Sequence, residues 1–427
     1  MKFKDTFCSS PWFHMRITNQ GYYNFCRWQT TKNNTLRRNI KDVTPTEYFQ
    51  QDMVGIREAM KNGTPIEECG LCMEMESHGK VSGREKQLLK TGIELDNFEK
   101  TTIASPFYHE FKKVTSDILP SDWQIDLGNY CNGACVFCDP KHSSTLAGEF
   151  LKLNLISEPP SPSWCSNDVQ FDEFINTIIS SSSLAYLHFI GGETLITPAF
   201  KKILITLIEH DLTDVTIGFT TNLMVWDDSI NALLMKFDNV NLGLSIETLS
   251  AVNDYARYPS KIENAKMILD KWVKFGKEHG WLMQIRITPT WITVEDIDSV
   301  FEYAYHSLIG VESCNYIHEP SYMRMDVLPS EFKNQAADRL EKWIKSKEKP
   351  NSTDNTVNIR NPSTVRSNII RDAISYLSYL RRTPHDPLLI PKMIDFITTI
   401  ETNRGNSILD YKPHYEKFLR PAGYRRS

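Results

Sequence analysis

The chain has 427 residues, of which 41% are hydrophobic and 24% charged, a composition that is typical of a globular protein and excludes a disordered or fibrous chain. This length exceeds one small domain, so we expect a large α/β unit with one or two further sections. The net charge of -5 argues against a broad nucleic-acid-binding surface.

The N-terminal sequence and the cysteines bear on the location of the protein. The first residues, MKFKDTFCSS, contain no apolar segment of the kind that directs secretion, and no run of about 18 apolar residues predicts a transmembrane helix. We therefore expect a cytoplasmic protein that does not bind a membrane. In such a protein the nine cysteines indicate metal binding or catalysis rather than disulfides.

Three sections follow one another along the chain. Residues 1–115 are rich in cysteine, glycine and aromatic residues, residues 116–325 alternate β-like runs with helical patterns, and residues 326–427 are predicted to be mainly helical. Strands that alternate with helices predict a parallel sheet, here an α/β fold with a partial (β/α)6 TIM-like barrel. In chain order, the predicted strands are 123–127, 185–190, 215–220, 240–246, 283–288 and 314–317, and the predicted helices include 46–61, 199–209, 262–275, 294–305, 331–345, 365–380 and 389–400.

Three cysteines follow the first predicted barrel strand with the spacing C-x3-C-x2-C. They are Cys131, Cys135 and Cys138, and no fourth cysteine lies nearby in the sequence. Three thiolates on one loop suit a cubane cluster in which one iron keeps an open coordination position. The alternatives are a zinc knuckle or separate buried cysteines, but zinc loops more often use paired C-x2-C knuckles. The triplet therefore predicts a [4Fe–4S] cluster.

The triplet resembles the signature of the radical S-adenosylmethionine (SAM) superfamily, in which an aromatic residue, here Phe137, precedes the last cysteine. Further motifs of that superfamily follow the later predicted strands in the same order. They are Gly191, Gly192 and Glu193 after the second strand, Asn222 after the third, Ser245 and Glu247 after the fourth, and Arg257 in the next stretch.

The resemblance implies the activity and the role of each motif. The reduced cluster would cleave SAM, and the resulting 5′-deoxyadenosyl radical would abstract hydrogen from a substrate. The Gly191–Glu193 element would bind the SAM amino group, and Arg257 would bind its carboxylate, for which a guanidinium fork is well suited. Glu247 stands where the superfamily more often has aspartate at the ribose contact. A low-potential donor such as flavodoxin or ferredoxin would supply the electron.

Four further cysteines lie in the first section. Cys8, Cys26, Cys69 and Cys72 resemble the auxiliary-cluster modules called SPASM and twitch, with the module placed before the barrel as in twitch-containing radical SAM proteins. Four thiolates would fully ligate a second [4Fe–4S] cluster, which would relay electrons. A structural zinc site is the alternative, because the Cys69/Cys72 knuckle permits one. The resemblance thus divides the chain into an N-terminal cysteine module (1–115), a radical SAM barrel (116–325) and a helical C-terminal region (326–427).

The resemblance does not identify the substrate. Enzymes with such modules often modify ribosomally made peptides, which is our first expectation, while others oxidise small alcohols or sugars. A non-catalytic iron–sulfur or zinc protein and an RNA-modifying enzyme are further alternatives. Cys165 is predicted to be a bystander, Cys314 and His318 fall near the expected barrel mouth, and Ser82-Gly83-Arg84 recurs in the resembled family without an assigned role.

Overall fold

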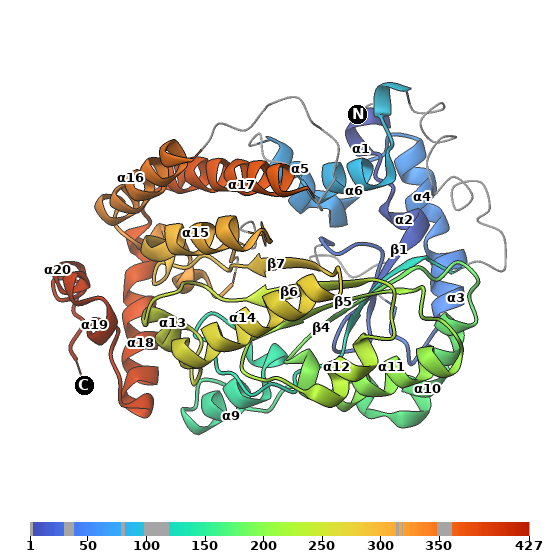
Figure 1. Cartoon of the computed structure of the whole chain (residues 1–427), viewed down its shortest axis with the longest axis horizontal. Coiled ribbons are helices and arrows are strands. Elements are labelled where there is room, and N and C mark those ends of the chain that lie inside the picture. Colours follow the sequence, from blue (N-terminus) through green and yellow to red (C-terminus); the bar gives the residue numbers. More distant parts are fainter. Residues whose placement is uncertain are drawn as a thin grey trace.

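The computed structural model describes residues 3–29, 38–77, 82–97, 119–312, 316–317, 319–347 and 361–426. At its centre lies an eight-stranded sheet in the order β2-β1-β3-β4-β5-β6-β7-β8 (Figure 1). From β3 onward all neighbouring strands are parallel, which confirms the predicted α/β fold with a partial barrel. These strands are β3 (Asp122–Asp126), β4 (Tyr186–Ile190), β5 (Thr216–Thr221), β6 (Val240–Ser245), β7 (Leu282–Arg286) and β8 (Gly310–Glu312).

The two faces of the sheet have different side chains, because successive residues of a strand point to opposite sides. On the outer face, Leu187, Phe189 and Phe219 are fully buried beneath the helices. On the inner face the same strands carry polar residues, such as Tyr186 and His188 on β4. Polar residues of this face border a cavity that is lined by β4, β6, β7, β8, the segment after β2 and residues of three helices.

The outer layer consists of the helices that connect the strands (Figure 1). The helices predicted at 199–209, 262–275 and 294–305 correspond to α11, α14 and the segment formed by the short helix Val294–Asp296 and α15. The helices of this layer are α9 (Ser144–Lys152), α10 (Asp168–Ile179), α11 (Pro198–Glu209), α12 (Asp228–Leu234), α13 (Val252–Ala256), α14 (Ile262–Glu278) and α15 (Ile297–Ser307).

The N-terminal section extends the barrel sheet. β1 (His14–Ile17) pairs in parallel with β3, and β2 (Tyr23–Asn24) pairs antiparallel with β1. Strand pairing therefore crosses the predicted boundary near residue 115, which the sequence did not indicate because these strands are very short. The helices of this section are α1 (Phe3–Thr6), α2 (Ser10–Phe13), α3 (Pro45–Glu47), α4 (Val54–Lys61), α5 (Gly70–Ser77) and α6 (Gly83–Thr91), with a π-helix at Tyr48–Asp52 between α3 and α4.

The last barrel strand differs in position from the prediction. The sequence pattern predicts a strand at 314–317, whereas β8 spans Gly310–Glu312. β8 has only three residues, and it combines a glycine with an inward-facing Glu312, so it lacks the apolar run that signals a strand. Cys314 and His318 lie outside the described residues.

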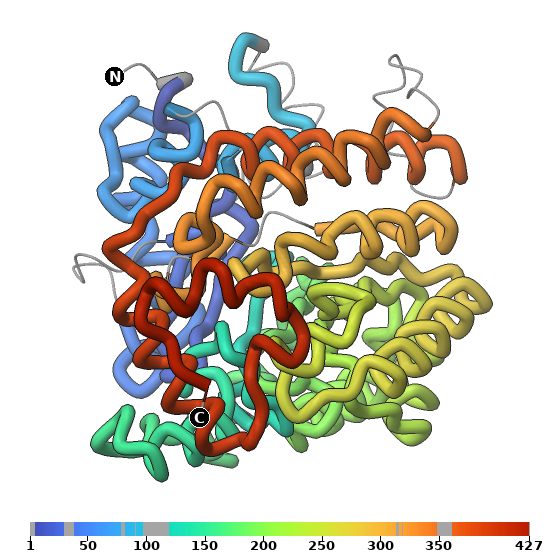
Figure 2. Tube along the Cα trace, turned by 90° about the vertical axis from the view of Figure 1, so that its left-hand side faces the viewer, coloured from blue at the N-terminus to red at the C-terminus, as the bar shows by residue number. Residues whose placement is uncertain are grey.

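The last three C-terminal helices lie at the carboxyl end of the barrel strands, and the first two run alongside α15 and β8 (Figures 1 and 2). They are α16 (Ser330–Ser346), α17 (Pro362–Arg382), α18 (Ile390–Arg404), α19 (Ile408–Tyr411) and α20 (Glu416–Leu419), and they confirm the predicted helical region. α17 packs against β8, and α19 packs against α13. Within the described part of the chain, none of the helices is both long enough and apolar enough to cross a membrane.

Candidate functional site

The cysteine triplet lies on the loop directly after β3, at the carboxyl end of the sheet. Burial raises the pKa of Cys138, and negative charge at Cys135 and Cys131 raises it further. Burial also raises the pKa of Cys135 to about 11, although the Arg257 guanidinium opposes the shift. Without a bound metal these buried thiols would stay protonated, and the positive charge of a bound metal would stabilise their thiolate form.

Neighbouring segments hold this loop through its backbone. The N–H of Ala134 donates to the carbonyl of Tyr258 at 2.6 Å, and the N–H of Val136 donates to the carbonyl of Ala256 at 3.0 Å. From α18, Nη2 of Arg404 donates to the carbonyl of Ala134 at 2.7 Å. The triplet is therefore fixed between the segment that contains Arg257 and the C-terminal helices.

The two glycines after β4 allow close contact with the cysteine loop. Gly191 has a φ of +95°, and a Cβ there would lie 2.2 Å from Oδ1 of Asp126. Gly192 has a φ of +24°, and a Cβ there would lie 2.1 Å from the carbonyl oxygen of Tyr130. The next residue, Glu193, donates its N–H to that same carbonyl at 2.8 Å. Only glycine fits at both positions, since a side chain would collide with backbone or a buried carboxylate.

The Glu193 carboxylate is buried and connects two of the strand-end loops. Its Oε2 accepts the N–H of Asn222 at 2.6 Å, and its Oε1 accepts the N–H of Leu195 at 3.2 Å. Burial raises the pKa of Glu193 to about 7 despite these hydrogen bonds. Asn222 in turn donates from Nδ2 to Oδ1 of Asn132 at 2.8 Å, and the same nitrogen lies 3.9 Å from Sγ of Cys131. The Glu193 carboxylate therefore fixes Asn222 next to the triplet.

Glu247 and Arg257 form a buried ion pair beside the triplet. Nε and Nη2 of Arg257 donate to Oε1 of Glu247 at 3.0 and 2.8 Å. The other carboxylate oxygen accepts the N–H of Thr288 at 2.6 Å. The guanidinium also lies over the ring of Phe137, 5.6 Å from its centre. Ser245 ends β6 at the same edge of the sheet. The predicted SAM contacts therefore gather at one end of the barrel, around the cysteine loop.

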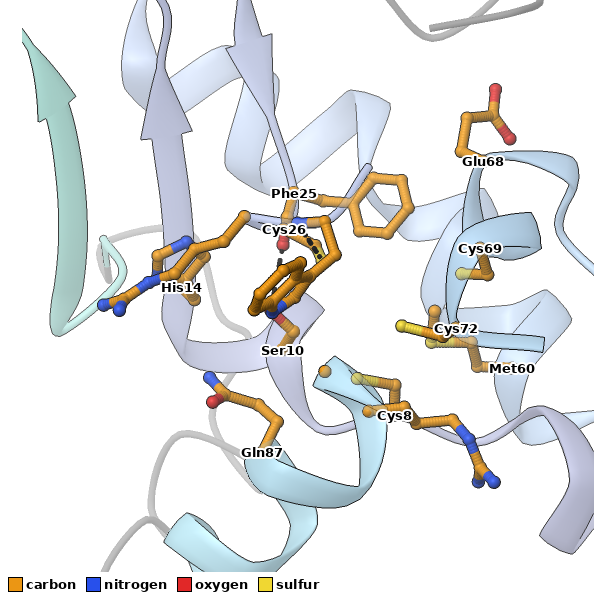
Figure 3. Close-up of a pocket in the computed structure, with 14 residues that line it drawn as sticks. Cys8, Ser10, His14, Phe25, Cys26, Met60, Glu68, Cys69, Cys72 and Gln87 are labelled. Atoms are coloured by element: carbon orange, nitrogen blue, oxygen red, sulfur yellow. Dashed lines mark hydrogen bonds between the residues drawn. The ribbon is translucent and has the colours of Figure 1, made fainter. Parts of the chain in front are cut away.

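The four N-terminal cysteines line a single cavity (Figure 3). They come from separate elements: Cys8 follows α1, Cys26 follows β2, Cys69 ends the short helix Glu67–Cys69, and Cys72 lies in α5. The sulfur atoms of Cys8, Cys69 and Cys72 point toward the side of the cavity on which Cys26 lies (Figure 3). Burial raises the pKa of Cys8 well above its usual range, and the other three cysteines raise it further.

The described residues do not form a preassembled site for a single metal ion. In the described ranges, no three His, Cys, Asp or Glu side chains lie close enough together to bind one metal ion. In a cubane each cysteine binds a different iron, so its four ligands stand further apart than the ligands of one zinc ion.

The Ser82-Gly83-Arg84 motif lies at the start of α6, beside this cavity. The Ser82 side chain caps the helix. The N–H groups of Gly83 and Arg84 form hydrogen bonds to Cys72 that lower its pKa, against a larger upward shift from burial. Nε of Arg84 donates to Oε1 of Glu76 at 2.9 Å. The motif thus positions and polarises one of the four thiols, a role that the sequence alone did not show.

The two cysteine sets lie at opposite ends of the sheet. Cys8 precedes β1, which runs parallel to β3, and Cys26 follows β2, which runs back in the opposite direction. Both therefore lie at the amino end of the barrel strands, whereas the triplet follows β3 at the carboxyl end. Cofactors bound at these sites would therefore lie at opposite ends of the sheet.

Cys165, Arg404 and the polar residues of the lumen lie around these sites. Sγ of Cys165 donates to the carbonyl of Leu127 at 3.0 Å and also contacts Oγ of Ser163. These hydrogen bonds connect Cys165 to neither cysteine set. Arg404, which holds the triplet loop, and the polar residues of the lumen were not predicted from the sequence. Alternating polar residues in otherwise apolar strands, such as Gln284 and Arg286, were the available signal for the lumen.

The comparison with known protein families agrees with this geometry. Residues 125–308 match the family model "Radical SAM superfamily". No curated protein matches the chain.

Several solved structures are similar to this chain at a low level. SuiB from Streptococcus suis bound to S-adenosylmethionine is 17% identical, with 73% of this chain and 67% of SuiB covered and a TM-score of 0.38. SuiB bound to its precursor peptide SuiA is 16% identical, with 73% and 66% covered and a TM-score of 0.38. The methyltransferase TsrM from Kitasatospora setae, with cobalamin and a [4Fe-4S] cluster bound, is 12% identical, with 70% and 60% covered and a TM-score of 0.31. Similarity at this level carries no information about substrate.

Proposed function

We propose that this SAM-dependent enzyme, whose residues 125–308 form a radical SAM superfamily domain, binds a [4Fe–4S] cluster through Cys131, Cys135 and Cys138 and abstracts hydrogen from a peptide or protein side chain. One observation supports the site above all others. The triplet and the four motifs that follow it converge at the carboxyl end of one parallel sheet, which is where ligands bind in such folds.

The residues around the triplet have distinct tasks in this proposal. When bound, the cluster and SAM supply a one-electron cleavage that yields a 5′-deoxyadenosyl radical. The Gly191–Glu193 loop and Asn222 present backbone and amide groups beside Cys131 for the polar groups of SAM. Arg257 offers its remaining N–H groups to the SAM carboxylate, while Glu247 balances its charge in the buried site. The C-terminal helices cover this end and keep water from a reactive radical.

The second part of the proposal concerns the N-terminal cavity. Its four cysteines provide a complete ligand set for an auxiliary [4Fe–4S] cluster, without an open position for SAM. Placement at the far end of the lumen suits electron transfer to or from a bound substrate. Metal analysis distinguishes this proposal from the zinc alternative. About eight irons per chain with labile sulfide supports two clusters, and four irons with one zinc contradicts the auxiliary cluster.

The peptide substrate is supported by the resemblance of the N-terminal cysteine set to SPASM and twitch modules, which often accompany peptide modification. We further propose that flavodoxin or ferredoxin reduces the enzyme in the cytoplasm.

The test is anaerobic reconstitution and reduction followed by measurement of 5′-deoxyadenosine. We expect SAM cleavage that accelerates with the partner peptide, and deuterium transfer from a labelled peptide into 5′-deoxyadenosine. Transfer only from small polyols supports a dehydrogenase instead, and no cleavage at all contradicts the proposed function.

A further inference from the structure

A cavity of about 750 Å³, the lumen cavity, is lined by inner-face residues of β4, β6, β7 and β8, by the turn before β7 and by α17. This volume is in the range of small-ligand sites. Its wall includes Arg286 at the end of β7, which pairs in register with Ser245 of the SAM motifs. Its wall also includes Arg27, which follows Cys26 and lines the N-terminal cysteine cavity as well. A ligand in this cavity would therefore contact residues that adjoin both proposed sites.

Two glycines keep room for the polar residues of this lumen. A Cβ at Gly218 would lie 2.4 Å from Oη of Tyr186 and 2.6 Å from Nδ1 of His188. A Cβ at Gly243 would lie 2.7 Å from Nε of Arg286. The neighbouring strands therefore lack side chains at the places where His188 and Arg286 occupy the lumen.

The charge of the lining differs in sign from that of the whole protein. Four cationic side chains line the cavity against two carboxylates, Glu312 and Asp372, whereas the chain as a whole carries a net charge of -5. Burial lowers the pKa of His188 well below its usual range, and the nearby arginines lower it further, so this side chain is neutral at pH 7. The cations are Arg27, Lys86, Lys277 and Arg286.

The N–H donors that line the cavity are only partly used in hydrogen bonds and ion pairs within the protein. Nη2 of Arg27 lies 3.2 Å from Oδ1 of Asp122, and Nε of Arg286 lies 3.2 Å from Oε2 of Glu312. A guanidinium has five N–H donors, so each arginine keeps others for a ligand. His188 is 3% exposed, and its Nε2 has no hydrogen-bond partner among the described residues. An unpartnered polar atom this deeply buried costs free energy unless a ligand satisfies it.

We propose that the lumen cavity binds a carboxylate of the substrate through Arg27, His188 and Arg286. The inference rests on the proposed radical SAM function and adds the substrate class, an acidic residue of a peptide. We propose a carboxylate as the ligand group because each arginine already pairs with a carboxylate of this chain, and a guanidinium fork matches the two oxygens of that group. A neutral His188 donates from Nε2 when its Nδ1 accepts the hydroxyl of Tyr186, 3.1 Å away. The bound carboxylate would anchor the substrate below the SAM motifs.

The test measures binding of two probes of equal shape to the reconstituted full-length enzyme. Acetyl-Glu-amide is expected to bind about tenfold more tightly than acetyl-Gln-amide in calorimetric titrations. Arg286→Gln should remove this difference, while Arg286→Lys should retain part of it. Glu312→Gln should increase it, because it removes the carboxylate that competes for Arg286. Lys271→Gln removes a positive charge over Trp226 on the outer face and should leave the difference unchanged.

The possible outcomes test separate parts of the proposal. Equal binding of the two probes, no binding of either, or an unchanged difference in Arg286→Gln would overturn the carboxylate site. Butyrate that binds as tightly as acetyl-Glu-amide retains the site but contradicts a peptide as the source of the carboxylate. SAM cleavage is measured in the same preparation. Cleavage without probe discrimination contradicts the cavity proposal alone, and discrimination without cleavage contradicts the proposed function alone.

Discussion

The two cysteine sites of this protein are built in opposite ways. The triplet occupies one short loop after β3, and its surroundings are the strand-end motifs and a buried ion pair. The N-terminal four come from separate short elements and enclose one cavity at the other end of the sheet. As ligands of the proposed clusters, three thiols would leave one iron open to a substrate, whereas four thiols would leave none.

The comparison shows how the position of a site follows from strand direction. Parallel strands bring their carboxyl ends to one edge, so motifs that are distant in sequence meet there without any local signal of contact. The N-terminal cysteines reach the opposite edge because β1 continues the parallel sheet and β2 turns the chain back. In our proposal, the sheet thus separates the site of SAM cleavage from the site of electron transfer.

The largest expected effect is in the triplet. Cys135→Ala removes one of three ligands on an open cluster, so we expect no detectable 5′-deoxyadenosine and a fall from about eight to about four irons per chain. Cys165→Ala is the matched control, because this thiol touches neither set, and it should keep both iron and activity. Cleavage at the wild-type rate in Cys135→Ala contradicts the assignment of the triplet.

The next effect separates the two sites. The double variant Cys69→Ala/Cys72→Ala should still cleave SAM without substrate turnover, because the triplet and its motifs lie at the other end of the sheet. Chromatography of 5′-deoxyadenosine and of the modified substrate measures the two activities in one sample. Loss of both activities in a folded, four-iron protein shows that the two sites are not independent.

A smaller effect concerns the buried pair beside the triplet. Arg257→Gln leaves the fully buried Glu247 without its cation, so we expect a loss of about 3–5 kcal/mol in the free energy of unfolding. Glu247→Gln/Arg257→Gln removes both charges and should recover part of that loss. As the exposed counterpart, Lys202→Gln breaks a surface pair with Asp172 and should cost less than about 1 kcal/mol. Denaturant titrations that show equal costs for Arg257→Gln and Lys202→Gln contradict this view.

The smallest effect tests the glycine contact. Gly192→Ala places a Cβ 2.1 Å from the carbonyl of Tyr130, so we expect destabilisation of about 2–4 kcal/mol and weaker SAM binding. Gly148→Ala lies in α9 with open space around the new Cβ, and there we expect stabilisation of about 0.5–1 kcal/mol. Thermal unfolding of both variants measures this contrast, and a neutral Gly192→Ala shows that the loop adapts.

The parts that could be predicted from the sequence are those with a regular signal. Apolar periodicity located β4 to β7 and α11, α14, α16 and α17, and motif spacing located the residues around the triplet. The short β1, β2 and β8 carry too few residues for a periodic pattern. The Glu247–Arg257 pair could not be predicted, because only the fold shows that these neighbours face each other in a buried site. Arg404 was missed for the same reason, since it reaches Ala134 from a helix far along the chain.

The most direct test of two different sites is electron paramagnetic resonance of the reduced, reconstituted enzyme with and without SAM. Two [4Fe–4S] signals are predicted, and SAM should change only one of them. That signal should persist in Cys69→Ala/Cys72→Ala, and the signal that does not respond to SAM should vanish there. A single signal, or a response to SAM in the signal that the double variant loses, would contradict the assignment of an open triplet and a closed N-terminal site.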